Sequence, residues 1–330
     1  MRLKIVPAIA VAGLALTACS SGTDDEQAAS AEATTFDNCG VKISVSVPPK
    51  RASTLEQGST DTLFLLGAKD QMVGYGHQKD APPKGYGLEG LKEISPSVPT
   101  SEQLRDADTD FILSPFEESF TPDMAGPRHE WSDLKVPTYV SNTECPDYGD
   151  NAGKTTFELL ERDLTELGQI FGREDEAAAL IKKQQESLNN SFKAPEGTTF
   201  LMLYSSVGGS PYVAGGPSIV TEMGKTVGMT NAFENVDEEW PQVSWEAIAE
   251  ANPDVIILGD LPARGEPGDK WQEKAADLEN NPGTKEMDAV RNKRYIVIPG
   301  VTASASARSL EAVDEMSKAL QDGIAEKKAS

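Results

Sequence analysis

A polar helix followed at once by a short, wholly apolar strand recurs along this chain. In residues 245–259 (WEAIAEANPDVIILG), the turn Asn252-Pro253-Asp254 separates a helical segment from a strand at 255–258. Residues 101–115 (SEQLRDADTDFILSP) repeat the arrangement around a strand at 111–113. Short apolar strands that alternate with helices are typical of parallel sheets covered on both faces. The repeat therefore predicts an α/β fold.

A helical segment divides this α/β pattern into two lobes. Residues 156–192 carry apolar side chains at helical spacing, and Gly168 and Gly172 are positions where this helix can break or bend. We predict further strands at 41–45, 72–75, 198–206 and 294–300, and helices at 62–68 and 309–325. The resulting domains are an N-terminal lobe (36–153), a helical connector (154–193) and a C-terminal lobe (194–330).

The N-terminus has the pattern of an export signal. Arg2 and Lys4 precede an uncharged, mostly apolar run at 5–18, which is shorter than the roughly 20 residues of a membrane-spanning helix. The segment Leu16-Thr17-Ala18-Cys19 resembles the bacterial lipobox. We predict a signal peptide (1–18), lipidation of Cys19 and a flexible tether (19–35). The alternative is an ordinary signal peptide in which Cys19 has no role.

Charge and cysteine content exclude several kinds of site. The formal net charge is −23, and loss of Arg2 and Lys4 with the signal peptide makes it −25, so nucleic acid and anionic lipid headgroups are not expected partners. With only two histidines, a metal site built from several imidazoles is not available. In an exported chain, Cys39 and Cys145 are expected to form a disulfide, and the alternative is two free thiols.

Three segments carry a resemblance to a known family. Residues 58–76 (GSTDTLFLLGAKDQMVGYG), 214–258 and 292–300 (NKRYIVIPG) resemble class III periplasmic binding proteins, which deliver iron–siderophore complexes, cobalamin or haem to ABC importers. The FDNCG start, the VPPKR step and SNTECP (141–146) resemble the actinobacterial lipoprotein branch. Residues 204–216 (YSSVGGSPYVAGG) are similar to members described as importers of a precursor of the deazaflavin F420. The resemblance covers residues 36 to about 325.

The resemblance implies two Rossmann-like lobes, with a ligand in the cleft at the carboxyl ends of their strands. It also implies one carboxylate on each lobe that docks on arginines of the permease. By position these are Asp61, where relatives usually carry Glu, and Glu222, which is followed a turn later by Lys225 where some relatives carry an acid. The alternative for both is a solvated surface carboxylate.

Ligand-binding side chains are expected in the loops that follow the strands. Aromatic faces and a guanidinium there suit a large, planar or aryl-bearing anionic ligand. As alternatives, Trp240 holds its own loop, Arg308 binds a neighbouring carboxylate, and Tyr75 and His77 line the contact between the lobes. The predicted ligand-binding residues are Gln57, Tyr75, His77, Phe116, Glu117, Tyr204, Tyr212, Trp240 and Arg308.

These features predict a monomeric, lipid-anchored substrate-binding protein, without a cofactor or a protein-only metal site. It captures a ferric siderophore and delivers it to an ABC permease with its ATPase. Cobalamin, haem or a deazaflavin are alternative ligands. A surface haem sensor is a second hypothesis, because tyrosine and histidine are axial ligands. An exported hydrolase is a third, with His77 and His129 as the only imidazole bases, but the chain has no GxSxG segment, and we do not expect an enzyme.

Overall fold

The computed structural model describes residues 33–326. The predicted signal peptide, the lipidation site Cys19 and most of the predicted tether lie outside the described residues. The last two residues of that tether belong to strand β1 (Thr34–Asn38), which pairs antiparallel with β2 (Val41–Val45). Phe36 and Ile43 of this hairpin pack into the core of the N-terminal lobe.

The N-terminal lobe contains a five-stranded sheet in the order β5-β4-β3-β6-β7, and every pair of neighbours in it is parallel. Its strands are β3 (Ala52–Thr54), β4 (Met72–Gly76), β5 (Lys92–Ser95), β6 (Phe111–Ser114) and β7 (Thr138–Val140), and its helices are α1 (Gln57–Leu65), α2 (Ser101–Asp106) and α3 (Arg128–Asp133). Helix α1 begins five residues before the expected helix at 62–68, because the chain enters it directly from β3.

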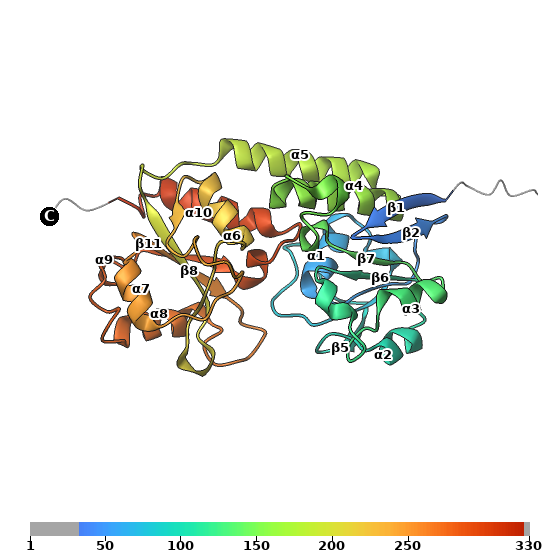
Figure 1. Cartoon of the computed structure of the whole chain (residues 1–330), viewed down its shortest axis with the longest axis horizontal. Helices are drawn as coiled ribbons and strands as arrows, with labels where there is room; N and C mark the ends of the chain where they lie inside the picture. Colours follow the sequence, from blue (N-terminus) through green and yellow to red (C-terminus); the bar gives the residue numbers. More distant parts are fainter. Residues whose placement is uncertain (1–32, 327–330) are drawn as a thin grey trace, which may run out of the picture. The chain divides into compact units, whose positions relative to one another are not determined.

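The C-terminal lobe repeats the design with the strand order β10-β8-β11-β12, in which neighbours are parallel, while the short β9 pairs antiparallel with β8. Its strands are β8 (Thr199–Ser205), β9 (Tyr212–Val213), β10 (Thr230–Asn231), β11 (Val255–Asp260) and β12 (Tyr295–Pro299). Its helices are α6 (Ile219–Thr226), α7 (Trp245–Ala251), α8 (Trp271–Asn280), α9 (Asp288–Arg291) and α10 (Ser309–Gln321). The expected α/β fold with parallel sheets is confirmed (Figure 1).

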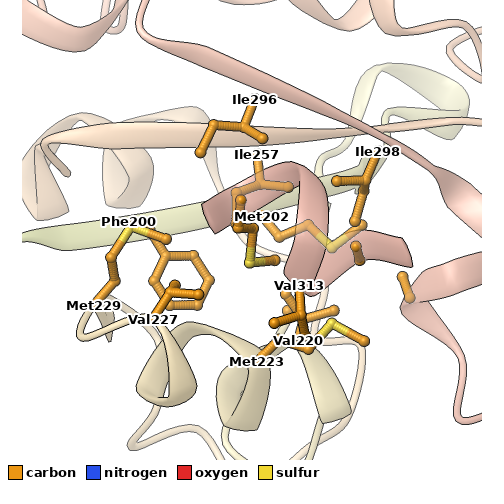
Figure 2. Packing of buried hydrophobic residues seen from close by; sticks show 14 of the residues in the cluster. Phe200, Met202, Val220, Met223, Val227, Met229, Ile257, Ile296, Ile298 and Val313 are labelled. Atoms are coloured by element: carbon orange, nitrogen blue, oxygen red, sulfur yellow. The ribbon is translucent and has the colours of Figure 1, made fainter. Parts of the chain in front are cut away.

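Side chains of the C-terminal strands alternate between two hydrophobic layers. Phe200 and Met202 of β8 pack with α6 and α10, whereas Leu201 and Leu203 pack on the opposite face with α7, α8 and α9. Figure 2 shows the first layer, where Val220 and Met223 of α6 and Val313 of α10 meet the sheet. Both faces of the sheet are therefore buried, which explains the continuous apolar runs of its strands.

The predicted connector consists of two helices, α4 (Thr156–Phe171) and α5 (Glu174–Asn190). Thr155 and Glu158 form a capping box at the start of α4, and Gly172 ends the helix in the left-handed conformation, with φ of 64°. Gly168 stays inside α4, where a Cβ atom would lie 2.7 Å from the Cβ of Ala177 in α5. The break that the sequence allowed at either glycine therefore occurs at Gly172.

Short 3₁₀ turns complete the described chain. They are η1 (Lys69–Gln71), η2 (Glu117–Phe120), η3 (Asn142–Glu144), η4 (Gly149–Asn151), η5 (Val207–Gly209) and η6 (Gly300–Ala303). Cys39, in the β1–β2 turn, forms a disulfide with Cys145, which follows η3, as expected. Across residues 33–326, none of the helices has the length and apolar character needed to cross a membrane.

Candidate ligand-binding cleft

The strand order of each sheet creates one place where consecutive loops lead apart. In the N-terminal lobe the chain runs from β3 to one side of the sheet and later returns to β6 on the other side, so the loops after β3 and β6 diverge. The same happens after β8 and β11 in the C-terminal lobe. Such divergence at the carboxyl edge of a parallel sheet is where α/β proteins bind ligands.

The two carboxyl edges face each other across a small cavity of about 20 Å³. This volume is enough for about one water molecule. Larger hollows, of about 390 and 560 Å³, are shallow grooves on the outer faces of the lobes and contain no residue of these edges. Residues of both lobes line the cavity: Glu56, Gln57, Gly58, Lys79, Pro115 and Phe116 from the first, and Tyr204, Val301, Ser304 and Ala305 from the second.

Glu56 is the electrostatic centre of the N-terminal side. It precedes α1, is 6% exposed, and its two oxygens lie 2.7 Å from His77 Nδ1 and 2.8 Å from Lys79 Nζ. Burial alone would raise the pKa of Glu56, but the hydrogen bond from His77 and the positive charge of Lys79 outweigh it and lower the pKa. His77 reaches this position with φ of 48°, in the left-handed region that few residues other than glycine adopt.

Tyr204 is the aromatic residue that lines the C-terminal side of the cavity, and Trp240 packs against it. The rings of Tyr204 and Trp240 lie with centroids 4.6 Å apart and planes inclined by 35°. Arg264 lies over the Tyr204 ring, 5.7 Å from its centroid, and burial raises the pKa of the Tyr204 hydroxyl. Phe116, from the loop after β6, lines the cavity opposite Tyr204. Together these rings offer apolar faces for stacking.

Arg308 is not placed as a free ligand-binding cation. Its Nη1 atom lies 3.0 Å from Asp61 Oδ2 and donates to the carbonyl of Ala81, while Nε and Nη2 bind Glu311. Asp61 belongs to α1 and Arg308 directly precedes α10, so the pair joins the two lobes. The alternative reading of Arg308, as a partner of a neighbouring carboxylate, describes this arrangement.

The structure also shows the surroundings of the two carboxylates for which docking on a permease is predicted. Asp61 has no exposed surface, and burial, opposed by Arg308, raises its pKa to about 6. Glu222 accepts hydrogen bonds from the backbone N–H groups of Thr156 and Phe157, at 2.9 and 3.2 Å, at the N-terminus of α4. Carboxylates are favourable there because a helix N-terminus carries unpaired N–H groups. Asp61 is therefore held inside the chain and Glu222 is half-buried, and docking on a permease stays a prediction for both.

The structure divides the predicted ligand-binding set. Gln57, Phe116 and Tyr204 line the cavity, Trp240 contacts Tyr204, and His77 binds Glu56. Three residues lie away from the cavity: Tyr75 is buried in β4, where burial and the charge of Glu93 raise its pKa; Glu117 binds Arg128, at 3.1 Å; and Tyr212 forms a backbone bridge with Gln242.

Sequence reasoning missed Glu56, Lys79 and Arg264. Glu56 directly precedes the predicted Gln57, and Lys79 follows His77 by two residues in the same loop, so position after a strand was a signal for both. Arg264 lies in the loop between β11 and α8, four residues after the end of β11, so position after a strand was a signal for it as well. Within residues 33–326, no three His, Cys, Asp or Glu side chains are grouped so that they could hold a metal ion.

Comparison with known proteins agrees with this architecture. The uncharacterized ABC transporter substrate-binding lipoprotein YvrC of Bacillus subtilis is 22% identical, with 97% of each chain covered. The petrobactin-binding protein YclQ of the same organism is 24% identical over 95% of this chain and 96% of its own. A solved structure from Saccharomonospora viridis, described as an ABC-type Fe3+-hydroxamate transport system, superposes with a TM-score of 0.69 at 24% identity, covering 87% of this chain and 98% of its own.

These relatives are substrate-binding proteins, and the prediction that the chain is not an enzyme agrees with them. A model of the periplasmic binding protein family matches residues 53–302, which include nearly all of both sheets and every residue that lines the cavity except Ser304 and Ala305. The chain belongs to the periplasmic binding protein family.

Proposed function

We propose that this protein is the lipid-anchored substrate-binding component of an ABC importer and that it captures a ferric siderophore or a similar iron chelate between its lobes. The observation that carries the proposal is the cavity at the two carboxyl edges, which is lined by Phe116 and by Tyr204, the latter in contact with Trp240. Aromatic and apolar walls with a few fixed polar groups are the usual lining of small-molecule sites.

The names of the relatives support an iron chelate as the ligand class. One relative binds petrobactin and a structural neighbour belongs to an Fe3+-hydroxamate transport system. In such a complex the chelator supplies the ligands of the iron, so the protein needs surfaces for stacking and hydrogen bonding rather than metal ligands of its own. Gln57 is an example of a fixed polar group, because its amide bonds to the backbone of Lys79, Asp80 and Ala81.

Entry of a chelate requires the carboxyl edges to separate. Ligand sites for compounds of this size occupy roughly 300 to 1,000 Å³, far more than the cavity of about 20 Å³. The connector helices α4 and α5 pack on the cores of both lobes, so we expect them to hold the lobes together while the edges part. Cys19 would tether the protein to the membrane that holds the permease and its ATPase.

Tryptophan fluorescence tests the proposal. The chain has four tryptophans, and Trp240 is the one that contacts the cavity residue Tyr204. A ferric complex bound there is expected to quench the emission saturably, and Trp240→Phe should remove a large part of that quenching. Trp245→Phe is the matched control, because Trp245 lies in the same lobe at the start of α7 and donates to the carbonyl of Gly209.

Saturable quenching by one ferric complex, reduced in Trp240→Phe and retained in Trp245→Phe, would support the proposed function. Saturation by cobalamin, haem or a deazaflavin would keep the importer and replace the iron chelate as its ligand. Failure of every compound in this set to bind would refute the proposed function.

A further inference from the structure

The cationic side chains at the N-terminal edge of the cleft already have carboxylate partners. Lys79 binds Glu56, which also binds His77. Arg128 is 4% exposed at its side chain and binds Glu117, while its other donors reach Asn38 and Thr138. A carboxylate that is already paired with a cation cancels most of the attraction that this cation would exert on an anionic ligand.

The C-terminal edge has the same property. Arg264 binds Asp269, which is 1% exposed, through Nε at 3.0 Å and also through Nη2, and its Nη2 atom reaches Ser205 as well. The guanidinium of Arg264 lies over the ring of the cavity residue Tyr204. Arg308, the remaining cation between the lobes in this region, is held by Asp61 and Glu311.

Carboxylates at the same edges are in excess. Glu118 and Glu144 belong to the turns after β6 and β7, and Glu239 directly precedes Trp240 on the other lobe. In the described part of the chain, no Lys, Arg or His lies within 4.0 Å of any of these three carboxyl groups.

The carboxylates of the two lobes are close enough to affect one another. Removal of water from its carboxyl group raises the pKa of Glu144 to about 7, and the negative charges of Glu239, Glu118 and Glu117 add to the effect. Glu239 accepts a hydrogen bond from Trp240, and Glu118 follows Phe116 by two residues, so aromatic rings of both lobes lie near this surplus of negative charge. The faces of such rings attract cations and accept neutral apolar groups, whereas they do not favour anions.

We infer that the cleft selects a chelate without net negative charge, either neutral or cationic. The inference rests on the proposed function and deepens it, because it names the charge class of the ligand. It replaces the anionic ligand that the sequence predicted from Arg308, since the cations of the cleft are paired within the chain. The formal charge of −23 on the whole chain acts in the same direction at longer range.

A series of ferric trihydroxamates that differ at one point tests the inference. Three hydroxamates neutralise the ferric ion, so ferrioxamine B is cationic through its free ammonium group, its N-acetyl derivative is neutral and its N-succinyl derivative is anionic. We expect Kd to rise from the cationic to the anionic member by about five- to tenfold at about 20 mM salt, and by about twofold or less at about 500 mM. The protein's tryptophan fluorescence gives each Kd.

Matched variants distinguish the effect of the carboxylates at the cleft from the effect of the net charge of the chain. Glu118→Gln/Glu144→Gln/Glu239→Gln should reduce the ratio of Kd between the anionic and cationic members to about twofold. The control variant Glu186→Gln/Glu196→Gln/Glu250→Gln removes the same number of exposed carboxylates from α5, from the segment before β8 and from α7. It should retain most of the discrimination, because these carboxylates lie away from the carboxyl edges.

The outcomes distinguish this inference from the proposed function. If the N-succinyl derivative binds as tightly as ferrioxamine B, or if only ferric tricatecholate or ferric citrate binds, the charge inference is wrong while the iron-chelate function stands. Equal loss of discrimination in both triple variants would also overturn it, because the effect would then belong to the whole chain. If none of the ferric complexes binds, the proposed function fails and the inference fails with it.

Discussion

The buried ion pair between Asp61 and Arg308 should respond unequally to removal of its two partners. Asp61 is fully buried, and Arg308→Met removes its cation. No other Lys, Arg or His of the described chain pairs with Asp61. Asp61→Asn leaves Arg308 with Glu311, at 2.9 Å, and with the carbonyl of Ala81. The orphaned carboxylate is therefore the costlier result.

The burial and the remaining partners of each group set the expected loss of unfolding free energy in each variant. Removing one partner of a buried pair costs about 3 to 5 kcal/mol of unfolding free energy, which is our expectation for Arg308→Met. Asp61→Asn replaces the ion pair by a hydrogen bond from the same guanidinium to an uncharged amide oxygen, at a cost of about 1 to 2 kcal/mol. The double variant Asp61→Asn/Arg308→Met should cost less than the two single changes added together, because it leaves no buried charge uncompensated.

Urea denaturation at pH 7, followed by far-UV circular dichroism, gives each free energy and its dependence on urea. Lys182→Met is the control, because Lys182 and Glu186 form an exposed ion pair at 3.7 Å that should contribute less than about 1 kcal/mol. An Asp61→Asn variant that is destabilised as much as Arg308→Met would refute this reasoning, as would strictly additive effects in the double variant.

Three further predictions concern the stability of the lobes. Replacing Cys39 and Cys145 by Ser opens a loop of sequence separation 106 and should lower the unfolding free energy by about 4 to 5 kcal/mol; a loss below about 1 kcal/mol would contradict this. Gly224→Ala should cost about 1 to 3 kcal/mol, because its Cβ would lie 2.1 Å from Cε1 of Phe200, and an unchanged urea midpoint would count against that packing. Burial raises the pKa of Asp163 from 3.8 to about 6. The stability contributed by protonation of Asp163 is therefore complete below about pH 3.8 and is lost as the pH rises through about 6. In urea midpoints measured across this pH range, Asp163→Asn should flatten the fall, and an unaltered slope would contradict this role of Asp163.

The parts of the fold that the sequence predicted are those recorded in local patterns. The run at 255–258 is apolar throughout because β11 lies between two parallel neighbours with helices on both faces. The end of α4 at Gly172 was visible because glycine readily adopts positive φ. By contrast, α10 ends at Gln321, four residues before the expected end, at a turn that contains Gly323 with φ of 85°.

The candidate site was predicted less completely because its pairings connect distant parts of the chain. Asp61 and Arg308 are separated by 247 residues, and Glu222 is separated from Thr156 by 66. Position after a strand brings Gln57 and Phe116 to the cavity, whereas Tyr204 reaches it from within β8, one residue before the end of that strand. Which carboxylate neutralises which cation depends on side-chain packing between lobes, and no local pattern records it.

The imbalance between acidic and basic residues explains which predictions about the site failed. The chain has 53 Asp and Glu against 30 Lys and Arg, so a cation that is withdrawn from water between the lobes has carboxylates available as partners. Burial penalises an unpaired charge strongly, and pairing within the chain removes that penalty. Aromatic rings carry no charge, so this penalty does not act on Tyr204 and Trp240 as it acts on Arg308. In an acidic binding protein, position after a strand is therefore not enough to assign an arginine to the ligand, because the chain itself can supply the carboxylate partner.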